Sequence, residues 1–318
     1  MPVEKLLVGT VPKQLYRKPA LSFAEQISHL ESSGMEFFDK EQALKELSSI
    51  SYYRLSGYWY PFRIRNNLGH VTNSFELKTN FNSVITLYEL DRKLRGLVLD
   101  AIERVEVAVR TQFTYHVGHQ YGAFGHTQAV NFHPKFKHQR WLQKLEEETQ
   151  RSSDDFIRHY AEKYEGFPTL PIWMLTEVMS LGALSFGYNG LLNDRKKGVE
   201  DKKAVSQHFN VHHKKLGDWL HILTYIRNIC AHHSRLWNRE LAIRPDKNNA
   251  REWRPPLTPR NDRVFYILLM LRHLLRATGN GDDWAVEVNQ LLEQISDNTR
   301  WRAAMGLPED WREHPIWK

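Results

Sequence analysis

The sequence predicts a mainly α-helical fold, and three observations support that class. Apolar residues recur at steps of three and four along several long segments, which is the spacing of one helix face. No region alternates short strands with helices, and no internal repeat or low-complexity tract is present in the sequence. With 318 residues, of which 41% are hydrophobic and 12% aromatic, the chain can also bury a sizeable core.

The N-terminal region is expected to begin with two short helices, over residues 22–37 and 40–50. Ser22 is a suitable N-cap and Gly34 a suitable stop for the first of them. The next segment, YYRLSGYWYPFRIR, is rich in aromatic residues and is interrupted by a glycine and a proline, so we expect a short strand or a loop. Its Tyr, Trp and Arg side chains could pack the core or stack on nucleobases, and packing is the favoured alternative.

A long amphipathic helix is predicted from Thr86 to His116. Its opposite face is strongly charged and places Glu106 four residues before Arg110, a spacing at which opposite charges meet on a helix. A solvated face with ion pairs explains these charges as well as a functional role does. The apolar face consists of Leu87, Leu90, Leu94, Leu97, Val98, Ala101, Val105, Ala108 and Val109.

The remaining elements follow from breaks in the helical pattern. The density of Gly, His, Pro and Lys predicts a loop over 117–140, which would be basic near a polyanion. The connector over 245–260 is rich in Pro and Asn, and the helices after it suggest a helical C-terminal extension. Helices are predicted over residues 141–164, 172–192, 216–237, 264–279 and 283–296.

The charge and the cysteine content restrict the partners and the compartment. A net charge of +7 and a pI near 9.3 would favour phosphate-rich or acidic partners. Cys230 is the one cysteine of the sequence, so an intramolecular disulfide or a Cys-rich zinc site is excluded and a cytoplasmic location is expected. The first residues do not resemble a signal peptide, and the longest strongly apolar stretch, 264–271, is too short to cross a membrane.

The segment IRNICAHH contains the strongest candidate site, because it sets Arg227, Asn228, His232 and His233 into a mostly apolar helical run. A guanidinium suits a phosphate, and an imidazole transfers protons near neutral pH. Such groups could cleave RNA without a metal. A base would take the proton of a ribose 2′-hydroxyl, that oxygen would attack phosphorus, and an acid would protonate the leaving 5′-oxygen, giving a 2′,3′-cyclic phosphate.

Spacing alone is weak evidence for this site, because several Arg–His pairs at similar distances are expected by chance. Arg65 to His70 is one, but it falls in a predicted turn, and Arg110 to His116 is another, but it lacks the asparagine. The segment at 226–233 combines a helix packed on one side with polar groups near its end, which is a rigid mount for a site. The alternative is a capped helix end whose cationic residues meet the helix dipole.

Helix geometry adds a constraint on the candidate site. Arg227 and His232 would lie roughly 140° apart on a regular helix, whereas Asn228 and His232 share a face. Asn228 could therefore orient the imidazole, while Arg227 must reach around the helix unless the helix loosens near His232. One chain supplies one clear histidine for a reaction that needs an acid and a base, so two chains could pool their motifs in a homodimer. His233 is the intramolecular alternative.

Other chemistries find less support in the sequence. It contains no phosphate-binding loop, dinucleotide fingerprint, His-Glu-x-x-His helix or nucleophile elbow. The histidines lack partner acids at metal-ligand spacing, so we predict no metal site and no cofactor. Cys230 lies on an apolar helical face and is expected to be a small buried side chain.

Four blocks in order resemble the Abi-like abortive-infection proteins of AbiD and AbiF type, within the HEPN superfamily. They are YYRLSGYWYPFR, LYELDRKLRGLVLDAIERVEVAVRTQ, PIWMLTEVMSLGALSFGY and IRNICAHHSRLWNR. The last block is similar to the HEPN Arg-x4-6-His signature, with Asn directly after Arg. The resemblance implies a HEPN-type helical bundle over 15–240, followed by the helical extension over 241–318, for which no resemblance is found.

The resemblance also implies a function. HEPN proteins are commonly dimeric, and many are metal-independent RNases with a composite site, which would make Arg227, Asn228 and His232 catalytic. Glu103, Glu106 and Arg110 become candidates to line or support that site. Abi-like members are associated with toxin-like growth arrest on phage infection, and some work with a small structured noncoding RNA. We therefore expect a phage-defence endoribonuclease with an RNA partner.

A second hypothesis from a different class is an RNA-binding ribonucleoprotein component that does not cleave its RNA. In that case the basic and aromatic segments would dominate the interface. The two hypotheses are compatible if a bound noncoding RNA restrains or guides the nuclease. The candidate RNA-binding residues are Arg54, Tyr58, Trp59, Arg63, Arg65, Lys135, Lys137 and Arg140.

Overall fold

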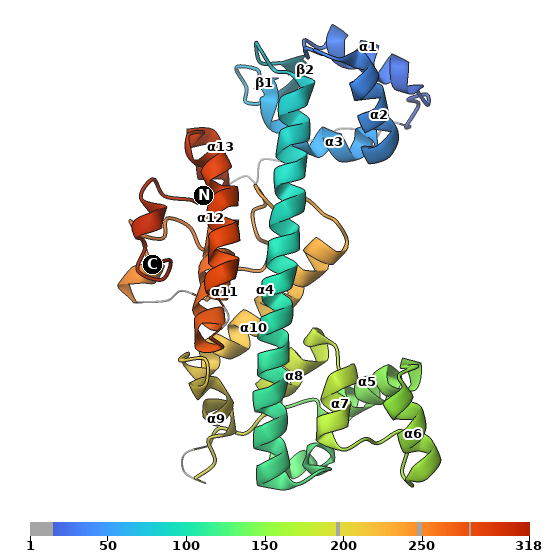
Figure 1. The fold of residues 1–318 in the computed structure, drawn as a ribbon, viewed down its shortest axis with the longest axis vertical. Helices are drawn as coiled ribbons and strands as arrows, with labels where there is room; N and C mark the ends of the chain where they lie inside the picture. Colours follow the sequence, from blue (N-terminus) through green and yellow to red (C-terminus); the bar gives the residue numbers. More distant parts are fainter. Residues whose placement is uncertain (1–14, 195–197, 247–249, 280) are drawn as a thin grey trace, which may run out of the picture. The chain divides into compact units, whose positions relative to one another are not determined.

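The computed structural model describes residues 15–194, 198–246, 250–279 and 281–318, and it is mainly helical, as predicted (Figure 1). The chain divides into two compact units, Met1–Tyr88 and Glu89–Lys318, and the predicted domain boundary at 240 lies inside the second. Two predictions concern residues that the structure does not describe. The absence of a signal peptide concerns residues 1–14, and the connector includes 247–249, all outside the described part of the chain.

The first unit contains short helices, a two-stranded hairpin and the start of a long helix. Ser22 caps the first helix as predicted, because its hydroxyl accepts from the backbone N–H of Glu25, whose carboxylate accepts from the N–H of Ser22. The two strands pair in antiparallel fashion. The elements are α1 (Phe23–Ser32), α2 (Lys40–Ile50), α3 (Tyr52–Trp59), η1 (Tyr60–Phe62), β1 (Arg63–Arg65), β2 (Val71–Phe75) and the beginning of α4 (Phe81–Tyr121).

The expectation of a strand or loop at the aromatic block was wrong for its first eight residues, which form α3. The Ser51 hydroxyl caps the helix by accepting from the backbone N–H of Arg54. Leu55, Tyr58 and Trp59 are buried at helical spacing, and this tertiary packing outweighs the cost of a glycine inside the helix. Only the last three residues of the block form a strand.

The predicted long helix is confirmed and extends beyond both expected ends, from Phe81 to Tyr121. The second unit contains the rest of α4 and the remaining elements. The loop predicted over 117–140 is shorter, since α4 continues to residue 121 and α5 starts at 138. The other elements are η2 (Gly125–Thr127), η3 (Ala129–Asn131), α5 (His138–Arg151), α6 (Asp155–Lys163), α7 (Ile172–Val178), α8 (Leu181–Gly190), α9 (Asp201–Gln207), α10 (His213–Ala231), η5 (Arg251–Trp253), α11 (Val264–Ala277), α12 (Asp282–Ser296), α13 (Thr299–Met305) and η6 (Trp311–Glu313).

Within the second unit, α4 is contacted by both the middle and the C-terminal helices (Figure 1). The Thr114 and Thr176 hydroxyls are 2.8 Å apart, which joins α4 to α7. The Trp284 indole N–H donates to the Leu97 carbonyl oxygen at 2.8 Å, which joins α12 to α4. Helix α11 is buried over most of its length and supplies a large part of the apolar core.

A buried carboxylate holds the chain that follows α10 against α4. Asp91 is fully buried, pairs with the buried Arg95 one turn later, and accepts the backbone N–H groups of Leu236 and Trp237. The Asp91–Trp237 bond is 2.8 Å long. A buried charge is tolerated only when such partners replace its hydration. This contact therefore determines where the segment after the candidate motif runs.

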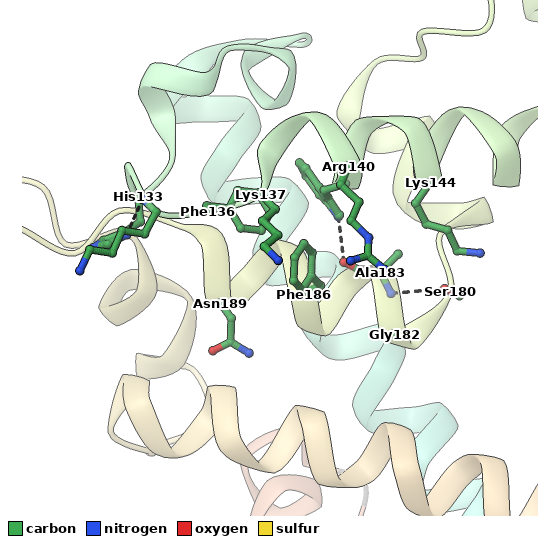
Figure 2. A pocket seen from close by; sticks show the side chains of 12 residues that line it. His133, Phe136, Lys137, Arg140, Lys144, Ser180, Gly182, Ala183, Phe186 and Asn189 are labelled. Carbon is green, nitrogen blue, oxygen red and sulfur yellow. Dashed lines mark hydrogen bonds between the residues drawn. The ribbon is translucent and has the colours of Figure 1, made fainter.

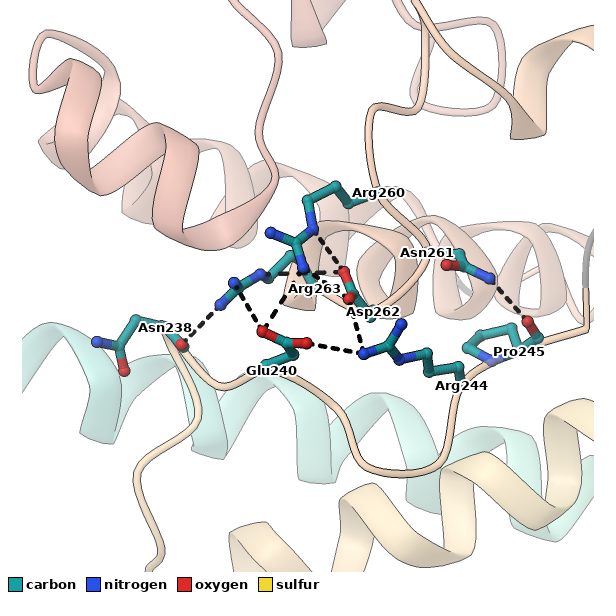
Figure 3. Close-up of polar contacts among 8 residues, drawn as sticks. All are labelled: Asn238, Glu240, Arg244, Pro245, Arg260, Asn261, Asp262 and Arg263. Atoms are coloured by element: carbon teal, nitrogen blue, oxygen red, sulfur yellow. Dashed lines mark hydrogen bonds and ion pairs between the residues drawn. The ribbon is translucent and has the colours of Figure 1, made fainter. Parts of the chain in front are cut away.

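The start of the C-terminal extension is joined to the preceding segment by an ion-pair cluster (Figure 3). Asp262 is nearly buried and accepts two hydrogen bonds from Arg260, both 2.7 Å long. Hydrogen bonds from Arg260, and the charges of the arginines around it, hold the pKa of Asp262 below its ordinary value. Glu240 pairs with Arg244 and Arg263 in the same cluster. In the described part of the chain, no helix is both long enough and apolar enough for a bilayer crossing.

We predict that Asp91→Ala lowers the free energy of unfolding by about 3 to 5 kcal/mol, because it removes the carboxylate that pairs with the buried Arg95 and accepts two buried backbone N–H groups. Urea titration followed by circular dichroism measures the change. Asp100→Ala is the matched control on the same helix, since Asp100 is half-exposed and pairs with Arg104, and it should cost about 1 kcal/mol or less. Equal losses for the two variants would contradict the importance assigned to the buried pair.

Candidate functional site

The candidate motif lies at the C-terminal end of α10, where the chain changes direction. The helix ends at Ala231, and His232 is its C-cap residue. The backbone N–H of His233 donates to the Cys230 carbonyl oxygen, and that of Ser234 donates to Ile229. This is the Schellman arrangement, in which the residue after the cap adopts a left-handed conformation. His233 occupies that position with a φ of 55°, where glycine is the usual residue.

The polar groups of the motif are accessible. Asn228, His232 and His233 are exposed, and Arg227 is half-buried. Within the described residues, the side chains of Asn228 and His232 have no hydrogen-bond partner. The regular helix ends before His232. The structure shows no hydrogen bond between the described side chains of Arg227 and His232, so their approach stays a prediction. The buried neighbour Cys230 is the small core side chain predicted from the sequence, and burial raises the pKa of its thiol to about 12.

A charged cluster on α4 lies next to the motif. Arg110 pairs with Glu106 and also donates to the Met179 carbonyl oxygen at 2.6 Å. Arg227 is close enough to Glu106 for its charge to lower the pKa of that carboxyl group. The structure therefore brings together Arg227, Arg110 and Glu106, three of the residues predicted from separate parts of the sequence.

Burial has the larger effect on Glu106 and raises the pKa of its carboxyl group above the ordinary value of 4.5. The charges of Arg110 and Arg227 and the hydrogen bond from Arg110 act in the opposite direction, while the charge of Glu103 adds to the rise. Glu103 itself is exposed. The cluster thus keeps an ionisable carboxyl group partly desolvated beside Arg110, and close enough to Arg227 to sense its charge.

The two rival Arg–His pairs are arranged differently. Arg65 and His70 flank the turn of the β1–β2 hairpin, as expected. His116 lies on α4, where its Nε2 atom is 2.8 Å from the buried carboxylate of Asp201. The Tyr121 hydroxyl donates to the same carboxylate, so His116 belongs to a separate polar group.

The candidate RNA-binding residues divide between the two units. In the first unit, Tyr58 and Trp59 are 1% and 2% exposed, so the packing alternative holds for them and they cannot stack on RNA in this conformation. Arg63 is half-buried with its guanidinium 3.8 Å from the centre of the Phe75 ring, and burial lowers its pKa. Arg54 and Arg65 are exposed, and Arg65 donates to the Gly69 carbonyl oxygen.

In the second unit, Lys135, Lys137 and Arg140 line a pocket of about 680 Å³ between α5 and α8 (Figure 2). The pocket also contains residues that the sequence analysis did not select, above all Lys144 and Phe186. The spacing of three and four residues between the cations at 137, 140 and 144 was available as a signal for one helix face. Phe186 comes from a different helix, and no sequence pattern linked it to them.

No cluster of three or more His, Cys, Asp or Glu side chains within the described ranges could hold a metal ion. The groups gathered at the motif are instead guanidinium, imidazole, amide and carboxyl groups. They can bind a phosphate, orient an imidazole and exchange protons with a substrate.

We predict that Glu106→Gln changes the pH dependence of stability. Because the folded protein raises the pKa of Glu106, it binds that proton more tightly than the unfolded chain does, and the contribution of this group falls as the pH rises from 4.5 through the raised pKa. The free energy of unfolding of the wild type relative to Glu106→Gln should therefore decrease over that interval. Denaturant titrations across the acidic range measure it, and a constant difference would contradict the shift.

Comparison with known proteins identifies the family to which the chain belongs. The model of the family described as Abi-like protein matches residues 45–238, which is more than half of the chain and includes α10 with its C-cap. No curated protein and no solved structure matches the chain significantly. The match ends at residue 238, close to the expected start of the C-terminal extension at 241. The chain belongs to the Abi-like protein family, which associates it with abortive infection, a form of phage defence.

Proposed function

We propose that this protein is a HEPN-type endoribonuclease that acts in phage defence without a metal ion. The observation that carries the proposal is the exposed end of α10, where Asn228 and His232 are accessible and Arg227 lies beside the Glu106–Arg110 pair. Family membership supports the defence role. The compartment is the cytoplasm, where the RNA targets of such an enzyme are found.

The reaction is an internal transfer of a phosphodiester. A neutral imidazole takes the proton of the ribose 2′-hydroxyl, and the 2′-oxygen attacks phosphorus. The guanidinium of Arg227 binds the equatorial oxygens as their charge increases. A protonated imidazole then gives its proton to the leaving 5′-oxygen. The products are a 2′,3′-cyclic phosphate and a 5′-hydroxyl, and the enzyme recovers its original proton count after the two imidazoles exchange a proton with water.

We expect the supporting residues to position the reactive groups when RNA is bound. Asn228 precedes His232 by four residues, so its amide can orient the imidazole from the same side of the helix. The negative charge of Glu106 attracts Arg227 and favours its presence beside the motif. A homodimer completes the site, because each chain contributes one His232, one as base and the other as acid.

A non-cleaving RNA-binding protein is the second candidate function, and the basic pocket between α5 and α8 favours it. The two functions predict different ends on the RNA that is recovered with the protein. RNA recovered from the purified protein should carry 2′,3′-cyclic ends if the chain is a nuclease. A discrete, unprocessed small RNA would favour the binding function alone, whereas both species together would indicate a nuclease regulated by a noncoding RNA.

We predict that His232→Ala abolishes RNA cleavage and growth arrest, because it removes the proton-transfer group while leaving the exposed helix end folded. The loss should be at least about 100-fold in a gel assay performed with a chelator. His159→Ala is the matched control, since His159 is also exposed and lies on α6. Cleavage by His232→Ala at the rate of the control would place the reaction elsewhere.

A second prediction concerns the composite site. Heterodimers that combine one wild-type chain with one His232→Ala chain should be inactive, because each site needs the imidazole of both chains. Differently tagged chains can be co-expressed and purified through both tags, and their cleavage rates compared with those of wild-type dimers. Half of the wild-type rate would instead favour His233 of the same chain as the second proton-transfer group.

A further inference from the structure

The pocket between α5 and α8 has an aromatic wall that two glycines make possible. A Cβ atom added at Gly190 would lie 2.7 Å from the Phe136 ring, and one added at Gly187 would lie 2.6 Å from Trp141. Both rings therefore lie directly against the backbone of α8. The Trp141 indole N–H donates to the Ala183 carbonyl oxygen at 2.9 Å, which fixes this buried ring of the pocket.

Part of this wall is open to solvent. Phe186 is 42% exposed, and its ring centre is 4.9 Å from that of Phe136, which is half-buried. Figure 2 shows Phe186 between Lys137 and Arg140 at the mouth of the pocket. An exposed phenyl ring beside a second ring presents a flat apolar surface to which a planar ligand can bind.

The charged side chains that line the pocket are all positive. Lys135, Lys137 and Arg140 are exposed, and in the described part of the chain none of them forms an ion pair. Lys144 is 3.5 Å from the Glu148 carboxylate, which also accepts from the Ser180 hydroxyl. None of the described residues that line the pocket is acidic. Three cations without counterions around an apolar wall favour an anionic ligand.

A short segment joins this pocket to the candidate active site. Ser180 lines the pocket, and the adjacent Met179 carbonyl oxygen accepts from Arg110 of the charged cluster. Gly182 also lines the pocket, and a Cβ there would be 3.6 Å from the Thr224 side chain of α10. Thr224 precedes Arg227 by three residues, about one helical turn. The pocket and the motif are thus connected through packed elements, α8 with α10 and the α7–α8 junction with α4.

We propose that this pocket binds one unpaired nucleotide of an RNA strand, with its base against Phe186 and Phe136 and its phosphates at Lys137 and Arg140. The position of that nucleotide relative to a cleaved linkage rests on the proposed function, but the binding site itself does not. A planar ring joined to an anion matches the aromatic wall and the cations together. A pocket of about 680 Å³ lies within the range that holds a small ligand. An acidic peptide would match the cations alone.

The test uses the full chain carrying His232→Ala, so that RNA stays intact during binding. Fluorescence anisotropy compares a single-stranded RNA with a duplex of the same length and with poly-glutamate. Phe186→Ala should weaken single-strand binding by about 5- to 100-fold and leave duplex binding unchanged, since only unpaired bases can stack. Phe186→Tyr should retain binding, and Phe156→Ala is the control, because Phe156 is an exposed phenylalanine on α6.

The charge contribution is measured separately. Lys137→Ala combined with Arg140→Ala should reduce the dependence of the logarithm of affinity on the logarithm of salt concentration by about 1.4, for two phosphate contacts on a single strand. The pocket assignment is overturned if Phe186→Ala binds the single strand as tightly as the control, or if poly-glutamate binding falls in parallel. Cleavage of a dinucleotide by Phe186→Ala with His232 intact tests the nuclease proposal independently, because this variant loses the stacking ring but keeps the catalytic imidazole. Retained cleavage with weakened single-strand binding would support both proposals, and loss of cleavage by His232→Ala alone would leave the pocket assignment unaffected.

Discussion

The buried carboxylate of Asp91 is the contact on which the candidate site depends. It accepts the backbone N–H groups of Leu236 and Trp237 and pairs with Arg95, so it joins α4 to the chain immediately after α10. The Schellman turn at His232 and His233 lies between this anchor and the last turn of the helix. With both ends of the turn held, its exposed imidazoles have a defined backbone from which to project, which is what a reaction that needs positioned groups requires.

Arg110 and Glu148 hold the junction between α7 and α8 in place, as Asp91 holds the chain after α10. Arg110 donates to the Met179 carbonyl oxygen, and Glu148 accepts from the N–H and hydroxyl of Ser180. Two neighbouring residues are thus held from α4 and from α5. The same junction therefore borders both the aromatic pocket and the charged cluster.

Sequence patterns predicted the helices better than the contacts between them. The long helix was predictable because its apolar spacing is unbroken, whereas the aromatic block was misread because a glycine and a proline outweighed the buried face of Leu55, Tyr58 and Trp59. The motif at 226–233 stands out in the sequence because its polar groups interrupt an apolar run, and its role as a site stays a prediction. Asp91 and Arg95 were missed because their spacing equals that of a surface ion pair, and only partners 145 residues away reveal the burial. Phe186 was also missed, because its partner Phe136 lies on a different element far away in the sequence.

Helix α8 contains Gly182, Gly187 and Gly190 within ten residues, and at least two of them are needed for the rings that pack on it. Each glycine makes a helix interior less favourable by about 1 kcal/mol relative to alanine. The helix therefore depends on its neighbours for its persistence, and it should exchange its amide protons sooner than α11, which is enclosed on almost all sides. Because α8 also lines the proposed nucleotide pocket, a ligand bound there would slow the exchange of its amide protons.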